Sequence, residues 1–309
     1  VAMALRLMNK DVTLLEQLAE YRVLTAEQIA RLRGVGSLQV VRRRLGQLAR
    51  EKLVESWGRG FGRRRGRPEK VYSIGCDGTD LLQRRGVLPA GTIHDQIDGR
   101  KACENHQLLL NWFRIHLDYV SSVLPQLTVK LLSSTSPFLS RDGDGRSVVS
   151  ESFQVSQGRK RNVRFVPDAV FAITDHKHRK SVLFFLEVDM GTETVASPGR
   201  GEHDFRQKIL NYQLYFKANR YRRYEKLWVT TFSGFRLLVL ANSAGRKGAL
   251  ARLIQEMPPN DFIWLTDPEL MFSNGLTGPI WTRGGARQDA SASIVGSLCG
   301  PSALLPLKR

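Results

Sequence analysis

Cysteine is scarce in this chain of 309 residues, with only Cys76, Cys103 and Cys299. These thiols are odd in number and far apart, which excludes a disulfide framework and a zinc site of known spacing, so we expect them to be inert. No apolar run approaches the roughly 20 residues of a membrane-spanning helix. The opening VAMALRLM is short and interrupted by Arg6, so we expect neither a signal peptide nor a membrane anchor, and we expect a cytoplasmic protein.

Acidic residues are also too few to balance the basic ones, since 47 Lys and Arg face 29 Asp and Glu for a net charge of +18. This balance favours nucleic acid as a partner, whereas a membrane surface is the alternative polyanion. Between Arg42 and Lys70, eleven basic residues face three acidic ones, a local excess of eight. Apolar residues recur at helical spacing around Val41 and Leu45, so these charges belong to a folded element. Double-stranded DNA is therefore the expected partner.

The segment around this basic stretch predicts three helices. One covers 11–21, and a second begins at Thr25, an N-cap with Gln28 at the capping-box position. Ser37 caps the third, which covers 37–53 and has Val40, Val41, Leu45 and Leu48 as its apolar face. The second and third helices, joined by a short turn that contains glycine, predict a helix-turn-helix.

Two strand-like runs, LVESWG and KVYSIG, follow the third helix and predict a hairpin with a long basic tip. A helix-turn-helix followed by such a hairpin is a winged helix, which we expect over residues 10–90. The tip contains Arg65-Gly66-Arg67-Pro68, which resembles the core of an AT-hook and would place arginines in a narrow minor groove. Phosphate contacts without base reading are the other interpretation. The expected DNA-binding residues are Arg42, Arg43, Arg44, Arg63, Arg64, Arg65 and Arg67.

The rest of the chain predicts an α/β domain with a mixed sheet. A polar linker is expected over 91–102, the domain itself over 103–283, and a flexible tail rich in Gly, Ala and Ser over 284–309. The domain begins with a helix at Glu104 and contains strands, a long helix over 201–221, and further strands at KLWVTTF and FRLLVLAN. The whole protein is thus expected to combine a winged helix with a mixed-sheet α/β domain.

Three carboxylates stand in two strand-like runs of this second domain, and Asp168 lies in the first of these runs. Asp168 comes after Pro167, whereas Glu187 and Asp189 stand two apart in the next strand and share one face of it. We therefore expect the three acids to converge at the end of the sheet. Hard oxygen ligands suit Mg²⁺ or Mn²⁺, which activates water and stabilises charge on a scissile phosphate. Acids at sheet margins also occur as ordinary structural residues, and that alternative stays open at this stage.

Pro167-Asp168 and Glu187-Val188-Asp189 resemble the motif of the PD-(D/E)xK, or restriction-endonuclease-like, superfamily, whose core is a helix, three strands, a helix and a strand. The sequence has Asp189 where the superfamily has its catalytic lysine. The resemblance implies that Lys208 is a lysine moved to the following helix, with Tyr212 one turn further on the same face. It also implies an extra metal-linked acid at Glu104. A solvated lysine and simple complementation of the helix dipole are the alternatives at these two positions.

The order of motifs from about residue 10 to 285 is similar to that of the replication-relaxation family of plasmids and integrative elements. The motifs are Glu104-Asn105-His106, the Pro-Asp strand, Glu187 to Glu193, the helix with Lys208 and Tyr212, and Gly278 to Trp281. The resemblance implies a role in replication or mobilisation of a mobile element.

Two kinds of function stay open within that role. One is a Mg²⁺-dependent endonuclease or nickase in which Asp168, Glu187 and Asp189 bind the metal and Lys208 assists. The other is a non-catalytic adaptor or transcriptional regulator that keeps the nuclease-like fold. The expected protein partners are a relaxase or replication protein, and a second copy of the chain that would form a homodimer.

Overall fold

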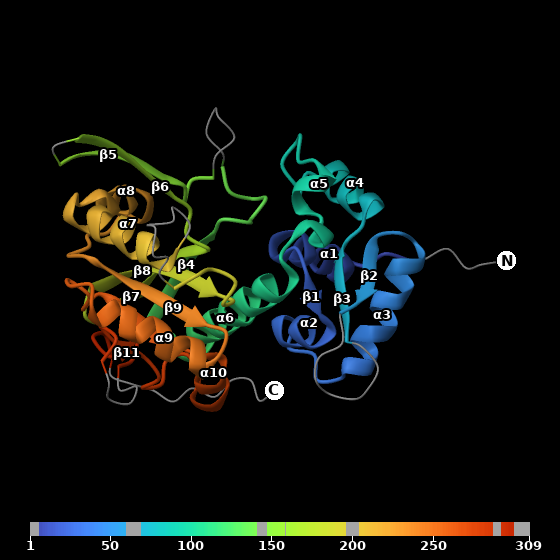
Figure 1. Ribbon diagram of the computed structural model, residues 1–309. Helices are drawn as coiled ribbons and strands as arrows, with labels where there is room; N and C mark the ends of the chain where they lie inside the picture. The colour runs from blue at the N-terminus through green and yellow to red at the C-terminus, as the bar shows by residue number, and fades with distance from the viewer. Residues whose placement is uncertain are drawn as a thin grey trace. The chain divides into compact units, whose positions relative to one another are not determined.

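The computed structural model describes residues 6–59, 69–140, 147–157, 159–195, 204–286 and 292–299. The chain folds into two compact units, Val1–Ile115 with Thr135–Ser140, and His116–Ser134 with Arg141–Arg309 (Figure 1). The boundary falls inside the long helix α6 (Glu104–Val123). In the part that the model describes, no helix is both long and apolar enough to cross a membrane.

The first unit contains the helices and the hairpin that the sequence predicts. Its elements are α1 (Asn9–Tyr21), β1 (Leu24–Thr25), α2 (Ala26–Leu32), α3 (Leu38–Arg50), β2 (Val54–Gly58), β3 (Lys70–Ile74), α4 (Cys76–Arg84), α5 (His94–Ile97) and η1 (Gly99–Lys101), followed by the start of α6. The three strands form an antiparallel sheet in the order β1–β3–β2. The strands of the hairpin, β2 and β3, pair over their full length, from Val54 with Ile74 to Gly58 with Lys70.

The ends of the helices follow the capping signals in the sequence. The Thr25 hydroxyl accepts the Gln28 backbone N–H at 3.1 Å, and the Gln28 side-chain oxygen accepts the Thr25 N–H at 3.1 Å. This confirms the predicted capping box at the start of α2. Ser37 caps α3 by accepting the Val40 N–H at 3.4 Å. Val40 itself is 48% exposed, so its assignment to the apolar face of α3 was wrong, whereas Val41, Leu45 and Leu48 are buried.

The segment predicted as a linker, 91–102, is folded in the first unit. It contains α5 and η1, and Ile97 is 1% exposed. The Gly99 N–H donates to the Ser73 hydroxyl at 2.9 Å, and Arg22 donates to the Asp98 carbonyl at 3.2 Å. The polar composition of this segment suggested a linker. In the structure, its backbone groups form hydrogen bonds with β3 and with the end of α1.

The second unit is built on a mixed sheet, as predicted. This sheet has six strands in the order β11–β10–β9–β8–β7–β4. Strands β4 (Leu127–Ser133), β7 (Ala169–Asp175) and β8 (Lys180–Asp189) are antiparallel neighbours. Strand β9 (Phe235–Ala241) runs parallel to β8. Strand β10 (Ile263–Thr266) is parallel to β9, and β11 (Thr282–Arg283) closes this edge antiparallel to β10. Strands β5 (Glu151–Gln157) and β6 (Arg159–Phe165), which lie between β4 and β7 in the sequence, form a separate two-stranded sheet.

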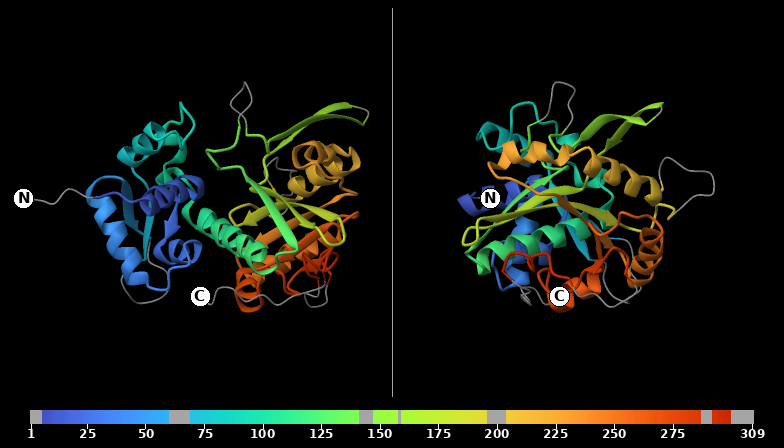
Figure 2. Two further views of the ribbon diagram at one scale, coloured as in Figure 1. Left: turned by 180° about the vertical axis from the view of Figure 1, so that it is seen from behind. Right: turned by 90° about the vertical axis from the view of Figure 1, so that its left-hand side faces the viewer.

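Helices α7 (Phe205–Lys217), α8 (Arg223–Trp228) and α9 (Ala244–Gln255) pack on one face of the six-stranded sheet. A short 3-10 helix, η2 (Arg220–Arg222), joins α7 to α8, and α10 (Pro268–Asn274) follows β10. The core of this face is rich in aromatic rings, with Tyr212 and Tyr215 packed against Phe185 and Phe235. Figure 2 shows the C-terminal part of α6 on the opposite face from α7.

Two predicted segments differ in the second unit. KLWVTTF is not a strand, since its first half belongs to α8, where Tyr224 and Trp228 stand four residues apart and are both buried. Their helical spacing outweighs the local preference of aromatic and β-branched residues for strands. The tail predicted to be flexible is packed over 292–299, with Ile294 and Val295 at 0% exposure. Its apolar side chains contribute to the core although the segment lacks periodicity.

Candidate functional site

Strand pairing places two of the predicted acids opposite each other. The last register pair between β7 and β8 is Ala169 with Leu186, so Asp168, one residue earlier, lies opposite Glu187. Two hydrogen bonds fix this position: the Asp168 N–H donates to the Leu186 carbonyl at 3.1 Å, and the Val188 N–H donates to Asp168 Oδ2 at 2.8 Å. The sequence predicted Asp168 within a strand. In the structure it lies just before β7, because the chain bends between β6 and β7.

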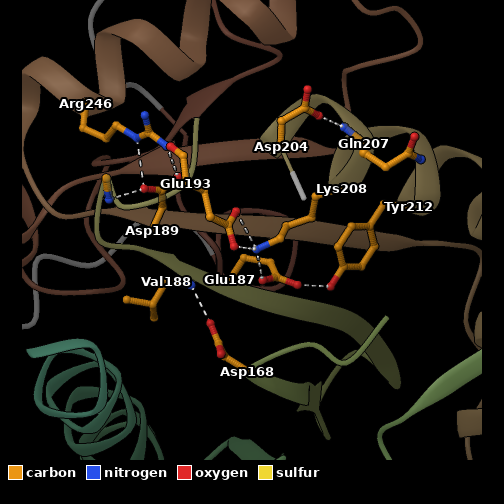
Figure 3. Close-up of polar contacts among 11 residues, drawn as sticks. Asp168, Glu187, Val188, Asp189, Glu193, Asp204, Gln207, Lys208, Tyr212 and Arg246 are labelled. Carbon is orange, nitrogen blue, oxygen red and sulfur yellow. Dashed lines mark hydrogen bonds and ion pairs between the residues drawn. The ribbon is translucent and has the colours of Figure 1, made fainter. Parts of the chain in front are cut away.

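Helix α7 brings the predicted lysine to these acids (Figure 3). The helix begins after Asp204, whose side chain accepts the Gln207 N–H at 2.8 Å. Lys208 Nζ, in its first turn, lies 3.0 Å from Glu187 Oε2. The Tyr212 hydroxyl, one turn later, donates to Glu187 Oε1 at 2.6 Å. Glu187 is only 4% exposed. Its two carboxylate oxygens have their polar partners in α7, namely Lys208 and Tyr212.

Burial and charge act together on this cluster. Burial raises the pKa of Glu187, and the Lys208 cation opposes that rise. Burial acts to lower the pKa of Lys208, but the negative charges of Glu187 and Glu193 outweigh it and raise the pKa above its ordinary value. The pKa of Tyr212 is raised by burial and by the neighbouring Glu187. Lys208 therefore carries a fixed positive charge at neutral pH.

The third predicted acid, Asp189, has a different partner. Arg246 of α9 donates from Nε to Asp189 Oδ1 at 3.0 Å and from Nη2 to Oδ2 at 2.9 Å. The Gly191 N–H adds a third hydrogen bond to Oδ1 at 2.6 Å. Arg246 also donates to the Glu193 carbonyl at 2.7 Å, so it binds the segment that follows β8 to α9. A bidentate arginine neutralises the carboxylate and takes both its oxygens, so Asp189 is a structural residue in this arrangement and a poor metal ligand.

The carboxylate oxygens that bind a divalent cation must lie close enough together to contact the same ion. Within the described ranges, Asp168, Glu187 and Asp189 do not form a group of three whose ligand oxygens all lie within 4.8 Å of one another. Mg²⁺ commonly binds through one or two protein carboxylates together with waters and substrate phosphates. Asp168 and Glu187 lie opposite each other and supply two carboxylates, although Lys208 and Tyr212 contact both Glu187 oxygens in this arrangement. The structure thus brings together Asp168, Glu187 and Lys208 and leaves Asp189 paired with Arg246.

Glu104, predicted as an extra metal-linked acid, has its partners in the first unit. The Trp57 indole N–H donates to Glu104 Oε2 at 2.9 Å, and Arg59 Nε lies 3.7 Å from Oε1. Arg59 also donates to Asn105 at 2.6 Å. Trp57 and Arg59 stand at and just after the end of β2, so the Glu104-Asn105 motif anchors the start of α6 to the hairpin.

Sequence reasoning missed Arg246, which stands 57 residues after Asp189. No local spacing indicates this pair, because the parallel β8–β9 connection brings the two residues together. Glu193, by contrast, belongs to a motif noted in the sequence, and its carboxylate lies 3.4 Å from Lys208 Nζ.

The candidate DNA-contacting residues of α3 divide into two groups. Arg42 and Arg43 are exposed, whereas Arg44 pairs with the buried Asp11 of α1, Nε to Oδ1 at 2.8 Å. Arg42 also lines a groove between α3 and the hairpin, together with Ser56, Lys70 and other residues of the first unit. Of the other predicted contacts, Arg63, Arg64, Arg65 and Arg67 lie outside the described residues.

The chain belongs to the replication-relaxation family, whose model matches residues 15–230. Membership suggests a role in the replication or relaxation of a plasmid or another mobile element. The matched range includes α3, the hairpin, Asp168, Glu187 and Lys208, and it ends before Arg246. No curated protein and no solved structure matches the chain.

Proposed function

We propose that this protein binds double-stranded DNA of a mobile genetic element and acts in its replication or mobilisation. The first unit serves as a winged helix: α1, β1, α2, α3 and the β2–β3 hairpin follow one another in the order of that fold. In this docking mode α3 enters the major groove, and the hairpin tip contacts the backbone or the minor groove. The net charge of +18 supplies the non-specific attraction.

The exposed surface of α3 supports this assignment. Arg42 and Arg43 face solvent, and Val40 beside them is 48% exposed, an apolar side chain suited to a thymine methyl group. Arg44 is excluded from the proposed contact surface because its guanidinium is bound to Asp11. The proposed DNA surface of α3 is therefore defined by Val40, Arg42 and Arg43.

DNA binding is tested by measuring affinity against salt concentration for wild type, the double variant Arg42→Ala/Arg43→Ala, and Arg84→Ala. Arg84 is an exposed arginine of α4 and serves as the control for the loss of a positive charge elsewhere on the first unit. Each lost phosphate contact lowers the slope of log K against log salt by about 1, so the double variant is expected to lose about 2 and the control none. Equal slopes for all three proteins would refute the proposed role of α3.

We further propose that the second unit is a nuclease-like domain that cleaves or nicks DNA. Its elements α6, β4, β7, β8, α7 and β9 follow one another as helix, three strands, helix and strand, with β5 and β6 inserted after β4. The observation that carries the proposal is the 3.0 Å approach of Lys208 Nζ to Glu187 Oε2 beside Asp168. In this proposal Lys208 of α7 takes the role of the lysine that the superfamily has at the position of Asp189.

The residues take complementary roles in this proposal. Asp168 and Glu187 would hold a Mg²⁺ or Mn²⁺ ion, which supplies charge stabilisation at a phosphate and an activated water when bound. Lys208 keeps its charge at neutral pH and offers an ammonium to the developing charge of the phosphate. Tyr212 orients Glu187 through its hydroxyl, and Asp204 fixes the start of α7, which carries both residues.

Cleavage is tested with supercoiled and single-stranded DNA in Mg²⁺ or Mn²⁺, comparing wild type with Asp168→Ala, Lys208→Ala and Lys217→Ala. Lys217 lies on the same helix and is exposed, so it controls for the loss of one charge from α7. Nicking by wild type and by the Lys217 variant, with loss in the other two while DNA affinity is kept, supports the nuclease. If no protein cuts any substrate with either metal, the cleavage proposal fails.

A non-catalytic adaptor or transcriptional regulator is the second candidate. It is favoured by the pairing of Asp189 with Arg246 and by the engagement of both Glu187 oxygens by α7. Such a protein would recognise DNA through the first unit and recruit a relaxase or replication protein. DNA affinity that is insensitive to Mg²⁺ and to Asp168→Ala, together with absent cleavage, would favour this candidate. Occupancy of a promoter would favour a regulator.

A further inference from the structure

Three side chains of the first unit form a cluster that the DNA-binding proposal does not use. Glu55 of β2, Cys76 at the start of α4 and His94 at the start of α5 each offer a ligand atom, and these atoms all lie within 4.8 Å of one another. Within the described ranges this is the only such group of three or more His, Cys, Asp or Glu side chains. We propose that Glu55, Cys76 and His94 form a binding site for Zn²⁺.

The hydrogen bonding of His94 prepares one of its nitrogens for a metal. His94 Nδ1 lies 2.9 Å from the Thr79 hydroxyl oxygen. That hydroxyl donates its single proton to the Gly75 carbonyl, 3.1 Å away, as expected for a threonine in a helix. In the tautomer in which Thr79 accepts from Nδ1–H, Nε2 carries no proton and can bind a metal. A histidine whose other nitrogen is fixed in this way is the usual form of a metal-ligating imidazole.

The elements that carry the three ligands are held together independently of the ligands themselves. The Gly75 N–H, at the start of α4, donates to the Leu53 carbonyl just before β2 at 2.9 Å. A Cβ atom at Gly75 would lie 2.2 Å from the Lys52 carbonyl oxygen, so the backbone segments are in close contact there. Gln83 of α4 donates to the Thr92 carbonyl at 2.6 Å and thereby holds the segment that leads to His94. The site is thus built on a fixed scaffold.

The donor set and its spacing select zinc. Bond lengths of about 2.0–2.3 Å place the ligands of tetrahedral zinc roughly 3.3–3.8 Å apart, so small side-chain rotations close the cluster around the ion. A thiolate and an imidazole favour Zn²⁺ over Mg²⁺, whose preferred ligands are all oxygens. Cys76 lies in the first turn of α4, where the helix dipole stabilises a negative ligand. Arg100 Nε, 3.2 Å from Glu55 Oε2, orients the carboxylate.

A bound zinc ion would join α4 and α5 to β2, the strand that leads into the basic hairpin tip. Three protein ligands leave a fourth position of the tetrahedron for water. The same geometry revises the expectation that the thiols are all inert. Cys76 has an imidazole and a carboxylate within bonding reach of one metal, whereas Cys103 and Cys299 belong to no such group among the described residues.

The proposal is tested on the full chain by titration with Zn²⁺ in competition with a chromophoric chelator, and with Co²⁺ as a spectroscopic substitute. The variants are Cys76→Ser and His94→Gln, with Cys103→Ser as the control because Cys103 is also an exposed free cysteine. We expect one equivalent of zinc in wild type and in the control, and at least a tenfold weaker affinity in both ligand variants. Thr79→Val, which removes the hydrogen bond to His94, should weaken affinity about 10- to 100-fold.

The cobalt complex separates true ligation from loose association. Wild type and Cys103→Ser should show a thiolate-to-cobalt charge-transfer band that Cys76→Ser lacks. Circular dichroism of the metal-free proteins confirms that the variants fold, which the exposed position of Cys76 leads us to expect. Zinc affinity unchanged in both Cys76→Ser and His94→Gln, or a wild-type cobalt complex without the band, would overturn the proposal. Neither DNA binding nor cleavage enters these measurements.

Discussion

Replacing Lys208 by methionine tests whether the pair with Glu187 is the electrostatic centre of the second unit. Methionine keeps the apolar stem of the side chain and removes the ammonium, which lies 3.0 Å from Glu187 Oε2. The carboxylate would then be left in a buried position with Tyr212 as its remaining close hydrogen-bond donor. An uncompensated buried charge is costly, so we expect the second unit to lose stability.

The size of the loss follows from the burial of the two partners. Removing one partner of a buried ion pair costs about 3–5 kcal/mol. The side chains of Lys208 and Glu187 are 25% and 6% exposed, so partial solvation of the lysine places the expected loss near the lower limit, about 3 kcal/mol. For a unit of this size, each kcal/mol lowers the melting temperature by about 2–4 °C, which gives a decrease of about 6–12 °C.

The loss should depend on pH through Glu187. Burial raises the pKa of Glu187 in the folded protein, and removal of the Lys208 cation raises it further. A group with a raised folded pKa stabilises the fold below its unfolded pKa, about 4.3, and this contribution is lost as pH rises through the folded value. The variant should therefore approach wild-type stability near about pH 4 and show its full deficit at neutral pH.

Urea denaturation of wild type, Lys208→Met and Lys217→Met at several pH values measures these effects. Lys217 is an exposed lysine of α7, so its replacement should change stability by less than about 0.5 kcal/mol. The double variant Glu187→Gln/Lys208→Met also removes the unpaired carboxylate charge, so it should recover part of the lost stability. Equal stabilities of the two lysine variants at neutral pH would show that the ion pair does not stabilise the second unit.

Three further predictions concern other buried groups. Asp11→Asn should lower stability by about 1.5–3 kcal/mol in chemical denaturation, because it weakens the charged hydrogen bonds that Asp11 accepts from Arg44; full wild-type stability would contradict this. The pKa of Asp175 is lowered chiefly by its hydrogen bond with His178, so Asp175→Asn should destabilise the protein above about pH 4 and progressively less as pH falls through the folded pKa, as thermal melts would show. Ile294→Ala should cost about 2–5 kcal/mol, measured by urea denaturation, because its side chain is fully buried although it stands in the tail.

Local signals in the sequence predicted the elements of the first unit well. Thr25 and Gln28 mark the start of α2, and Ser37 marks the start of α3, because capping depends on residues three positions apart in the chain. The same reasoning placed Val40 on the apolar face of α3, although it is largely exposed. A single helical position rotates a side chain by about 100°, so adjacent apolar residues cannot all face the core.

Long-range pairing set the limit of sequence reasoning in the second unit. The acid motifs indicated Asp168 and Glu187 correctly as neighbours, since strands close in sequence pair antiparallel. Lys208 was placed by resemblance, and its contact with Glu187 agrees with that expectation. The partner of Asp189 was missed because α9 follows β9, a strand parallel to β8. The spacing of apolar residues does not indicate which residue of α9 lies near the end of β8.

The Asp189–Arg246 pair links two positions that should change together during evolution. A lysine at position 189 would complete the PD-(D/E)xK motif that the sequence resembles, yet it would place its ammonium against the Arg246 guanidinium, which now donates to both Asp189 oxygens. Conversely, losing Arg246 alone would leave a buried carboxylate without its cation. Family members with lysine at the position of Asp189 should therefore lack arginine at the position of Arg246, and a change at either site alone should be rare among functional descendants.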